Sequence, residues 1–349
     1  MNKKAKFAIW GAVILGAGNG IINVIKQSNS DEKFSWGELF LALGKGAATG
    51  AAGGLIIGAV ADHQNSLVEP IDTDSILLAL ASKVKLNPND GRYIQLSKRA
   101  DWLIDILETE LSDELKDRPH RFGSTENGTA LKNKFDIDIC LPLKSDAFSS
   151  TEQMFYHVDE ILRKYIGRNS VVSIRNQKKS IGVFFKIGAE EYKIDILPNK
   201  ITRKRGNKSS GYLYVNNGGL FQKPTYTKTD VSLLKSSKIT ETQKKILVLL
   251  KEWKKSRNVP VSSHLLQNLI LDAYRMNYGR IPRRFTDKVI MVLEHIAVNI
   301  NSIVISSKEN TNNILTNIPQ SDKDEIASAC HQLIEKYDYQ PNSIIKIIQ

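Results

Sequence analysis

Hydrophobic residues follow three different patterns along this chain, and each pattern predicts a different kind of structure. Residues 7–25 and 39–61 are almost continuously apolar, and Lys45 is the single charge in the second stretch. Each stretch is about long enough to cross a bilayer as a helix. Residues 90–117 instead carry leucine or alanine at every third or fourth position, which predicts a long amphipathic helix. Further along, alternating apolar residues predict strands.

The N-terminal segment, residues 1–65, is predicted to form an apolar helical hairpin. Lysines at positions 3, 4 and 6 would keep the N-terminus in the cytoplasm, with the rest of the chain on the cytoplasmic face of the inner membrane. A soluble hairpin that packs in a homo-oligomer is a second interpretation, and it gives a cytoplasmic protein. A cleaved signal is a third, against which the length of the apolar segment argues. Close helix packing is favoured by glycines at positions 44, 46, 50, 53, 54 and 58.

The rest of the chain is predicted to be an α+β protein in two parts. The first part, residues 66–235, would hold a mixed sheet with the long helix as its spine. The second part, residues 236–349, would be a C-terminal helical domain. Helices are expected at residues 75–84, 90–117, 151–165, 240–255, 263–277, 284–300 and 321–337, and strands at 135–139, 171–177, 180–188 and 192–198.

Carboxylates within apolar strands are the clearest sign of chemistry in the sequence. Asp136 and Asp138 are two residues apart, so both side chains point to the same face of a strand. Asp195 lies between two isoleucines in a later strand, and the turn Gly123-Ser124 precedes all three acids. Adjacent carboxylates repel each other unless a cation lies between them. Oxygen ligands of this kind suit Mg²⁺, with Mn²⁺ as an alternative.

The glycine-serine turn, the D-x-D strand and the strand with the lone aspartate resemble the polymerase-beta-like nucleotidyltransferase superfamily over residues 119–198. With the spine helix before them and the helix containing LLKEWK (residues 249–254) after them, residues 72–300 resemble the bacterial CD-NTases. These are relatives of cyclic GMP-AMP synthase and oligoadenylate synthase that act in anti-phage signalling. The resemblance implies a nucleotidyltransferase palm, a helical lobe and two bound Mg²⁺ ions.

The same resemblance implies roles for individual residues. Asp136 and Asp138 would hold both metal ions, while Asp195 would hold the ion at the attacking hydroxyl and help to deprotonate that hydroxyl. The triphosphate would be bound by Gly123, Ser124 and Lys251.

Charge and aromatic residues add weaker indications. The net charge of +12 fits a polyanionic partner such as a nucleoside triphosphate or a nucleic acid. Residues 200–208 (KITRKRGNK) are predicted to be a loop, either simply solvated or mobile beside the triphosphate or product strand. Tyr214 would either stack on a nucleobase or lie in the core. The cysteines and histidines have neither zinc nor disulfide spacing.

Three functions agree with these features. The first is an enzyme that condenses nucleoside triphosphates into a cyclic or linear nucleotide signal, with release of pyrophosphate, in bacterial anti-phage defence. The second is a template-independent polymerase, or an enzyme that modifies tRNA or protein, so that an oligonucleotide product or acceptor is a further partner. The third is a non-enzymatic membrane scaffold, against which the presence of all three acids argues. The apolar hairpin departs from the soluble CD-NTases and leaves open a membrane effector protein as a partner.

Overall fold

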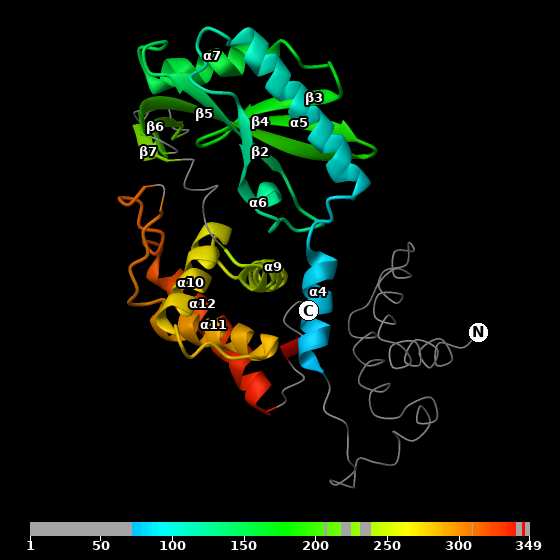
Figure 1. Cartoon of the computed structure of the whole chain (residues 1–349), viewed down its shortest axis with the longest axis vertical. Helices are drawn as coiled ribbons and strands as arrows, with labels where there is room; N and C mark the ends of the chain where they lie inside the picture. The colour runs from blue at the N-terminus through cyan, green and yellow to red at the C-terminus, as the bar shows by residue number, and fades with distance from the viewer. Residues whose placement is uncertain are drawn as a thin grey trace, which may run out of the picture.

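A sheet with helices on one face and a bundle of helices make up the described part of the chain (Figure 1). The computed structural model describes residues 72–205, 208–217, 225–230, 239–308, 310–339 and 344–345. The apolar hairpin predicted for residues 1–65 lies outside these residues. Among the helices that are described, none is both long enough and apolar enough to span a bilayer.

The sheet is mixed, as the sequence predicted. Its strands are β1 (His120–Phe122), β2 (Ile137–Lys144), β3 (Val171–Asn176), β4 (Ile181–Ile187), β5 (Glu190–Arg205), β6 (Lys208–Val215) and β7 (Thr225–Thr229). The strand order is β1-β2-β5-β4-β3, while β6 pairs with β5 and β7 pairs with β6. Strands β2 and β5 run parallel, and the other pairs are antiparallel.

Helices α5 (Gly91–Glu110) and α7 (Thr151–Arg163) cover one face of this sheet (Figure 1). The leucine stripe of α5 faces the strands, and Leu96, Leu103 and Leu107 are fully buried in the core between helix and sheet. The helix begins at Asp90, whose side chain accepts a hydrogen bond from the amide of Arg92. The predicted spine helix is therefore present.

The spine helix ends earlier than the leucine pattern suggested, at Glu110 rather than at residue 117. Beyond it, the chain runs along the end of β2. The amide of Lys116 donates to the carbonyl of Pro142 (2.9 Å), and the amide of Lys144 donates to that of Glu114 (2.8 Å). These bonds to the sheet replace the last turns of the helix, because the same backbone groups cannot serve both structures.

The bundle consists of α4 (Thr73–Val84), α9 (Glu241–Ser256), α10 (Ser263–Met276), α11 (Phe285–Asn299) and α12 (Gln320–Tyr339). Helix α4 belongs to it, since Leu77 and Leu80 are buried in the same core as Leu249 of α9 and Val289 of α11. The sequence-based division groups α4 with the sheet, whereas its apolar face packs on the C-terminal helices. Periodicity shows which face of a helix is apolar, but it does not show what that face packs against.

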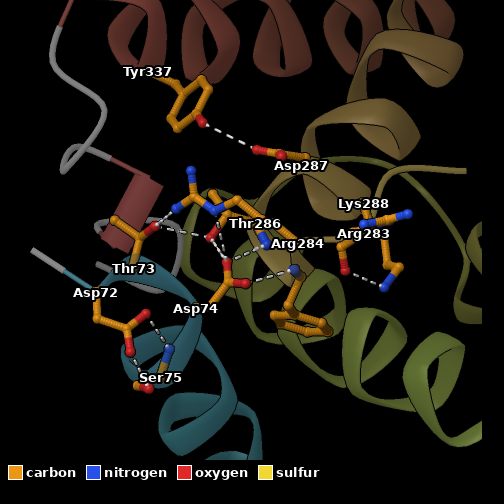
Figure 2. Close-up of polar contacts among 11 residues, drawn as sticks. Asp72, Thr73, Asp74, Ser75, Arg283, Arg284, Thr286, Asp287, Lys288 and Tyr337 are labelled. Carbon is orange, nitrogen blue, oxygen red and sulfur yellow. Dashed lines mark hydrogen bonds and ion pairs between the residues drawn. The ribbon is translucent and has the colours of Figure 1, made fainter.

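The first turn of α4 is bonded to the first turn of α11 (Figure 2). The Asp74 carboxylate accepts hydrogen bonds from the amides of Phe285 and Thr286, each at 2.8 Å, and from the Thr286 hydroxyl at 2.5 Å. Arg284 precedes α11 and provides no side-chain cap of its own. Helix α4 therefore supplies the N-terminal cap that α11 lacks.

Residues 200–205 and 208 of the basic tract belong to paired strands, so their prediction as a loop was wrong. Strand β5 continues to Arg205, and the register pairs Arg205 with Lys208 at the start of β6. Only Gly206 and Asn207 lie between these two residues, and such a two-residue connection is typical of a tight hairpin. Backbone pairing with β6, rather than the hydropathy of its side chains, makes this segment a strand.

Candidate active site

The three predicted aspartates lie on one face of the sheet, opposite α5 and α7. The parallel register of β2 and β5 pairs Asp138 with Asp195. Because side chains alternate along a strand, the isoleucines on either side of each acid point into the core beneath α5 and α7. Asp136 lies one residue before β2 and shares the parity of Asp138. The sequence pattern therefore identified the face of the sheet on which these acids lie.

Gly123 allows the preceding strand to pass close to the acids. Phe122, the last residue of β1, pairs with Asp138, and the four-residue helix α6 (Gly123–Glu126) follows directly. Gly123 has a φ of +83°, and a Cβ added there would lie only 2.0 Å from Oδ2 of Asp138. A side chain at this position would be strained and would also displace the carboxylate. The predicted glycine-serine turn is thus next to the acids.

Burial and mutual repulsion raise the pKa of two of the acids, Asp138 and Asp195. Burial, together with the charges of Asp136 and Asp195, raises the pKa of Asp138 to about 7. Burial also raises the pKa of Asp195, whose residue is 9% exposed. In the described structure, the Oδ1 atom of Asp195 is buried and has no hydrogen-bond partner. The site therefore favours a cation next to these carboxylates.

Lys193 is a member of the site that the sequence analysis missed. Its Nζ lies 2.7 Å from Asp195 and 3.2 Å from Asp136, so it bridges the two acids. Burial lowers the pKa of Lys193, but the bond to Asp195 and the charges of both acids raise it above its ordinary value. Lys193 precedes Asp195 by two residues on β5, so the strand period that located the acids was also the signal for this lysine.

Lys251 reaches the site from the helical bundle. It lies on α9, is 8% exposed, and donates from Nζ to the carbonyl of Thr129 at 2.9 Å. The amide of Thr129 in turn donates to the carbonyl of Ser124, also at 2.9 Å. Burial lowers the pKa of Lys251 to about 8, helped by Lys254 and opposed by the nearby Asp136 and Asp138. The predicted residues Ser124 and Lys251 are therefore connected through one threonine.

Tyr214 is not brought to the acids, so its predicted stacking on a nucleobase is not supported by its position. It is 4% exposed, and its ring packs 5.0 Å from that of Phe155 and 5.9 Å from that of Tyr156 on α7. The register pairs Lys200 with Tyr212, which places Tyr212 and Tyr214 on the helix-covered face of the sheet. The alternative interpretation, a core tyrosine, describes its location.

The donor atoms of this site suit Mg²⁺. In the part of the chain that the structure describes, no three histidine, cysteine, aspartate or glutamate side chains are close enough together to hold a metal ion as they stand. Lys193 instead neutralises two of the three acids. The ligands available are nevertheless all carboxylate oxygens, and the buried Oδ1 of Asp195 has no partner. Hard oxygen ligands of this kind fit Mg²⁺, which Asp136, Asp138 and Asp195 would hold.

Comparison with known proteins supports the fold at low sequence identity. No model of a protein family matches the sequence, and no curated protein matches it. Among solved structures, CdnC of E. coli MS115-1 with ATP superposes with a TM-score of 0.59 at 20% identity, over 78% of this chain and 94% of that one. The CD-NTase CdnG of Bradyrhizobium diazoefficiens in complex with GTP gives a TM-score of 0.59 at 14% identity, over 76% and 91%. The Cid1 poly(U) polymerase, with Mg 3′-dATP bound, gives a TM-score of 0.54 at 12% identity, over 79% of this chain and 98% of that one.

The chain thus shares its overall fold with these nucleotidyltransferases, as its sequence predicted. Within that class, the similar structures include both CD-NTases and a poly(U) polymerase. At these identities the likeness establishes the architecture, namely a palm sheet, a spine helix and a helical lobe.

Proposed function

We propose that this protein is a Mg²⁺-dependent nucleotidyltransferase that condenses nucleoside triphosphates into a cyclic or linear oligonucleotide, with release of pyrophosphate. The observation that carries the proposal is the pairing of Asp138 with Asp195 across two parallel strands, with Asp136 beside them. A purely structural role would not favour three carboxylates on one face of the sheet, because their repulsion destabilises the fold and the single lysine that bridges two of them, Lys193, only partly offsets it.

The proposed reaction is an in-line displacement at the α-phosphorus of a nucleoside triphosphate. A sugar hydroxyl attacks, a new P–O bond forms, the bond to the β-phosphate oxygen breaks, and pyrophosphate leaves. Asp195 is the residue best placed to accept the hydroxyl proton, since its raised pKa favours proton transfer and its Oδ1 is unpaired in the described structure. Bound Mg²⁺ would supply neutralisation of the charge that develops on the phosphate oxygens.

Lys251 and Ser124 would bind the triphosphate. Lys251 is largely buried, yet the carboxylates of Asp136 and Asp138 help to keep it charged. A buried ammonium group with one carbonyl partner retains two N–H donors for phosphate oxygens. Because Lys251 lies on α9 and Ser124 on α6, a triphosphate bound between them would join the bundle to the sheet.

The test is to incubate the purified protein with each labelled ribo- and deoxyribonucleoside triphosphate and Mg²⁺, and to size the products. Asp136→Ala should abolish product formation without unfolding the protein. Asp195→Asn should lower kcat by about a thousandfold while nucleotide affinity changes little, because that residue acts mainly in the transition state. Turnover by either variant at the rate of the unmodified protein would refute the assignment of the site. No product from any nucleotide would favour the scaffold hypothesis.

A template-independent polymerase that extends an oligonucleotide is the second candidate. The observation in its favour is the basic sequence of the β5–β6 hairpin. Lys200, Arg203, Lys204 and Arg205 follow Asp195 on the same strand, β5, and Lys208 begins β6. Such a polymerase should bind single-stranded oligonucleotide with an affinity that falls steeply with salt, whereas an enzyme that joins only nucleotides should not. A role in anti-phage signalling rests on the CD-NTase likeness, and a membrane effector as partner rests on the apolar stretches at residues 7–25 and 39–61.

A further inference from the structure

The α10–α11 loop, taken together with the last two residues of α10 (residues 275–284, RMNYGRIPRR), exposes apolar and basic residues together. Met276 is 66% exposed, Tyr278 is 88% exposed and Ile281 is 36% exposed. The arginines at positions 275, 280, 283 and 284 are exposed as well. Large apolar side chains usually lie within the core, so three of them among four arginines on one short loop need a physical reason.

The exposed tyrosine is held on an ordered turn. The amide of Arg280 donates to the carbonyl of Asn277 at 2.9 Å, and Gly279 has a φ of +83°. These are the features of a type II turn with Tyr278 at its tip, since that turn requires a positive φ at its third residue. The Asn277 side chain adds a bond to the carbonyl of Ala273 at 2.9 Å. The backbone therefore holds Tyr278 outward instead of allowing it to fold back onto the bundle.

The charge of the loop is only partly neutralised. Arg275 pairs with Asp272, and Arg284 lies 4.0 Å from Asp74. Arg280 and Arg283 form no ion pair with any other residue that the structure describes. Residues 275–288 carry five basic side chains and a single acidic one, Asp287. This surface therefore suits a negatively charged partner that also accepts apolar side chains.

The loop lies where the N-terminal segment joins the described structure. Figure 2 shows Thr73 and Asp74 of α4 beside Arg284 and Thr286, and Arg284 donates to the Thr73 hydroxyl at 3.2 Å. The second apolar stretch of the sequence ends at residue 61, so eleven residues, 62–72, separate it from α4. Eleven residues reach at most about 40 Å. A bilayer that receives residues 39–61 is thus within reach of this loop.

We propose that the α10–α11 loop is a membrane-contact surface that binds anionic lipid. Tyr278, Met276 and Ile281 would enter the interface between headgroups and acyl chains, and the arginines would bind lipid phosphates with their stems along the apolar surface. A membrane accounts for the two aliphatic residues better than single-stranded nucleic acid does, because nucleic acid is bound by stacking on several aromatic rings in a groove. The helical bundle would then lie directly on the bilayer.

The experiment uses the full chain with an environment-sensitive fluorophore at Tyr278→Cys. The two native cysteines are 1% and 0% exposed, so the introduced thiol is the accessible one among the described residues. The control is Val304→Cys, at a residue that is also highly exposed (72%) and lies beyond the opposite end of α11. Each labelled protein is mixed with vesicles of phosphatidylcholine, with vesicles of phosphatidylcholine and phosphatidylglycerol in equal amounts, or with a single-stranded oligonucleotide.

Anionic vesicles should shift the emission at position 278 to the blue and make it sensitive to a quencher carried on the lipid chains, while position 304 stays unchanged. Arg280→Glu and Arg283→Glu should each weaken the vesicle response by about fivefold or more, since each arginine near an anionic surface contributes about that factor. No shift at position 278 with anionic vesicles, an equal shift with phosphatidylcholine alone, or a shift with the oligonucleotide only would each overturn the proposal. Turnover does not enter the test, so its outcome is independent of the proposed function.

Discussion

The substitution Gly123→Ala tests the geometry of the site more directly than removal of an acid does. The added Cβ would lie 2.0 Å from Oδ2 of Asp138, whereas ordinary contacts begin at 3.4 Å. The carboxylate must therefore move by about 1.4 Å, which its side chain can do by rotation. A displacement of about 1 Å in a reacting group costs on the order of 100-fold in rate. We expect kcat/KM to fall by about 100-fold, with the fold retained.

The matched control for this variant is Gly167→Ala. Gly167 has a φ of +85°, nearly that of Gly123, but nothing lies within 4 Å of its added Cβ. Both variants force alanine into the left-handed region, which costs about 1–2 kcal/mol of stability. Melting temperatures should therefore fall by similar amounts, while pyrophosphate release should fall only in Gly123→Ala. Equal activity in the two variants would refute the contact between Gly123 and Asp138 as a requirement of the site.

Three further outcomes are expected. In EDTA at pH 7–8, Asp138→Asn should stabilise the fold by about 4 kcal/mol in urea unfolding, because a folded-state pKa of about 7 lies above the unfolded value of 3.8. This gain in stability should vanish towards pH 4. A gain that does not depend on pH would contradict the raised pKa of Asp138 in the folded state. Asp74→Ala should cost about 1–3 kcal/mol, more than Asp72→Ala, because it removes the cap of α11. Burial raises the pKa of Asp74, but its hydrogen bonds to Thr286 and Phe285 lower the pKa by more, to below 3.8. The stability that the Asp74 carboxylate contributes should therefore be present above pH 3.8 and be lost in stronger acid. Lys251→Met should raise the KM for nucleoside triphosphate at least tenfold with a smaller change in kcat, and an unchanged KM would exclude it from triphosphate binding.

The acids could be located from the sequence because a strand has a fixed period of two residues. The spacing of Asp136 and Asp138 places both on one face whatever the strand pairs with, and the same rule applies to Lys193 and Asp195. Tyr214 shows the limit of this reasoning. Its strand also alternates, but only the register between β5 and β6 decides whether Tyr214 lies on the same face as the acids or on the opposite one. The sequence does not contain that register in any local form.

The position of α4 was beyond prediction for a related reason. Its apolar stripe is plain from the sequence, and two different cores were available to bury it. The choice depends on contacts with helices that lie far along the chain, including the bonds from Asp74 to α11. By contrast, the sequence Gly206-Asn207 is a local signal for a two-residue hairpin connection. The prediction of a loop relied instead on the charge of the tract.

The placement of α4 in the bundle has a consequence for synthesis of the protein. Ribosomes complete α4 at Val84 but do not begin its partner α9 until Glu241. At translation rates of about 5–20 residues per second, the apolar face of α4 stays unpaired for roughly 10–30 s before synthesis of the helices on which it packs begins. During that interval the sheet and its covering helices can fold by themselves, while Leu77 and Leu80 have no native contacts to bury them. Nascent chains that stall between Val84 and Glu241 would carry a helix α4 whose apolar face is exposed, and chaperones bind exposed apolar surfaces of this kind.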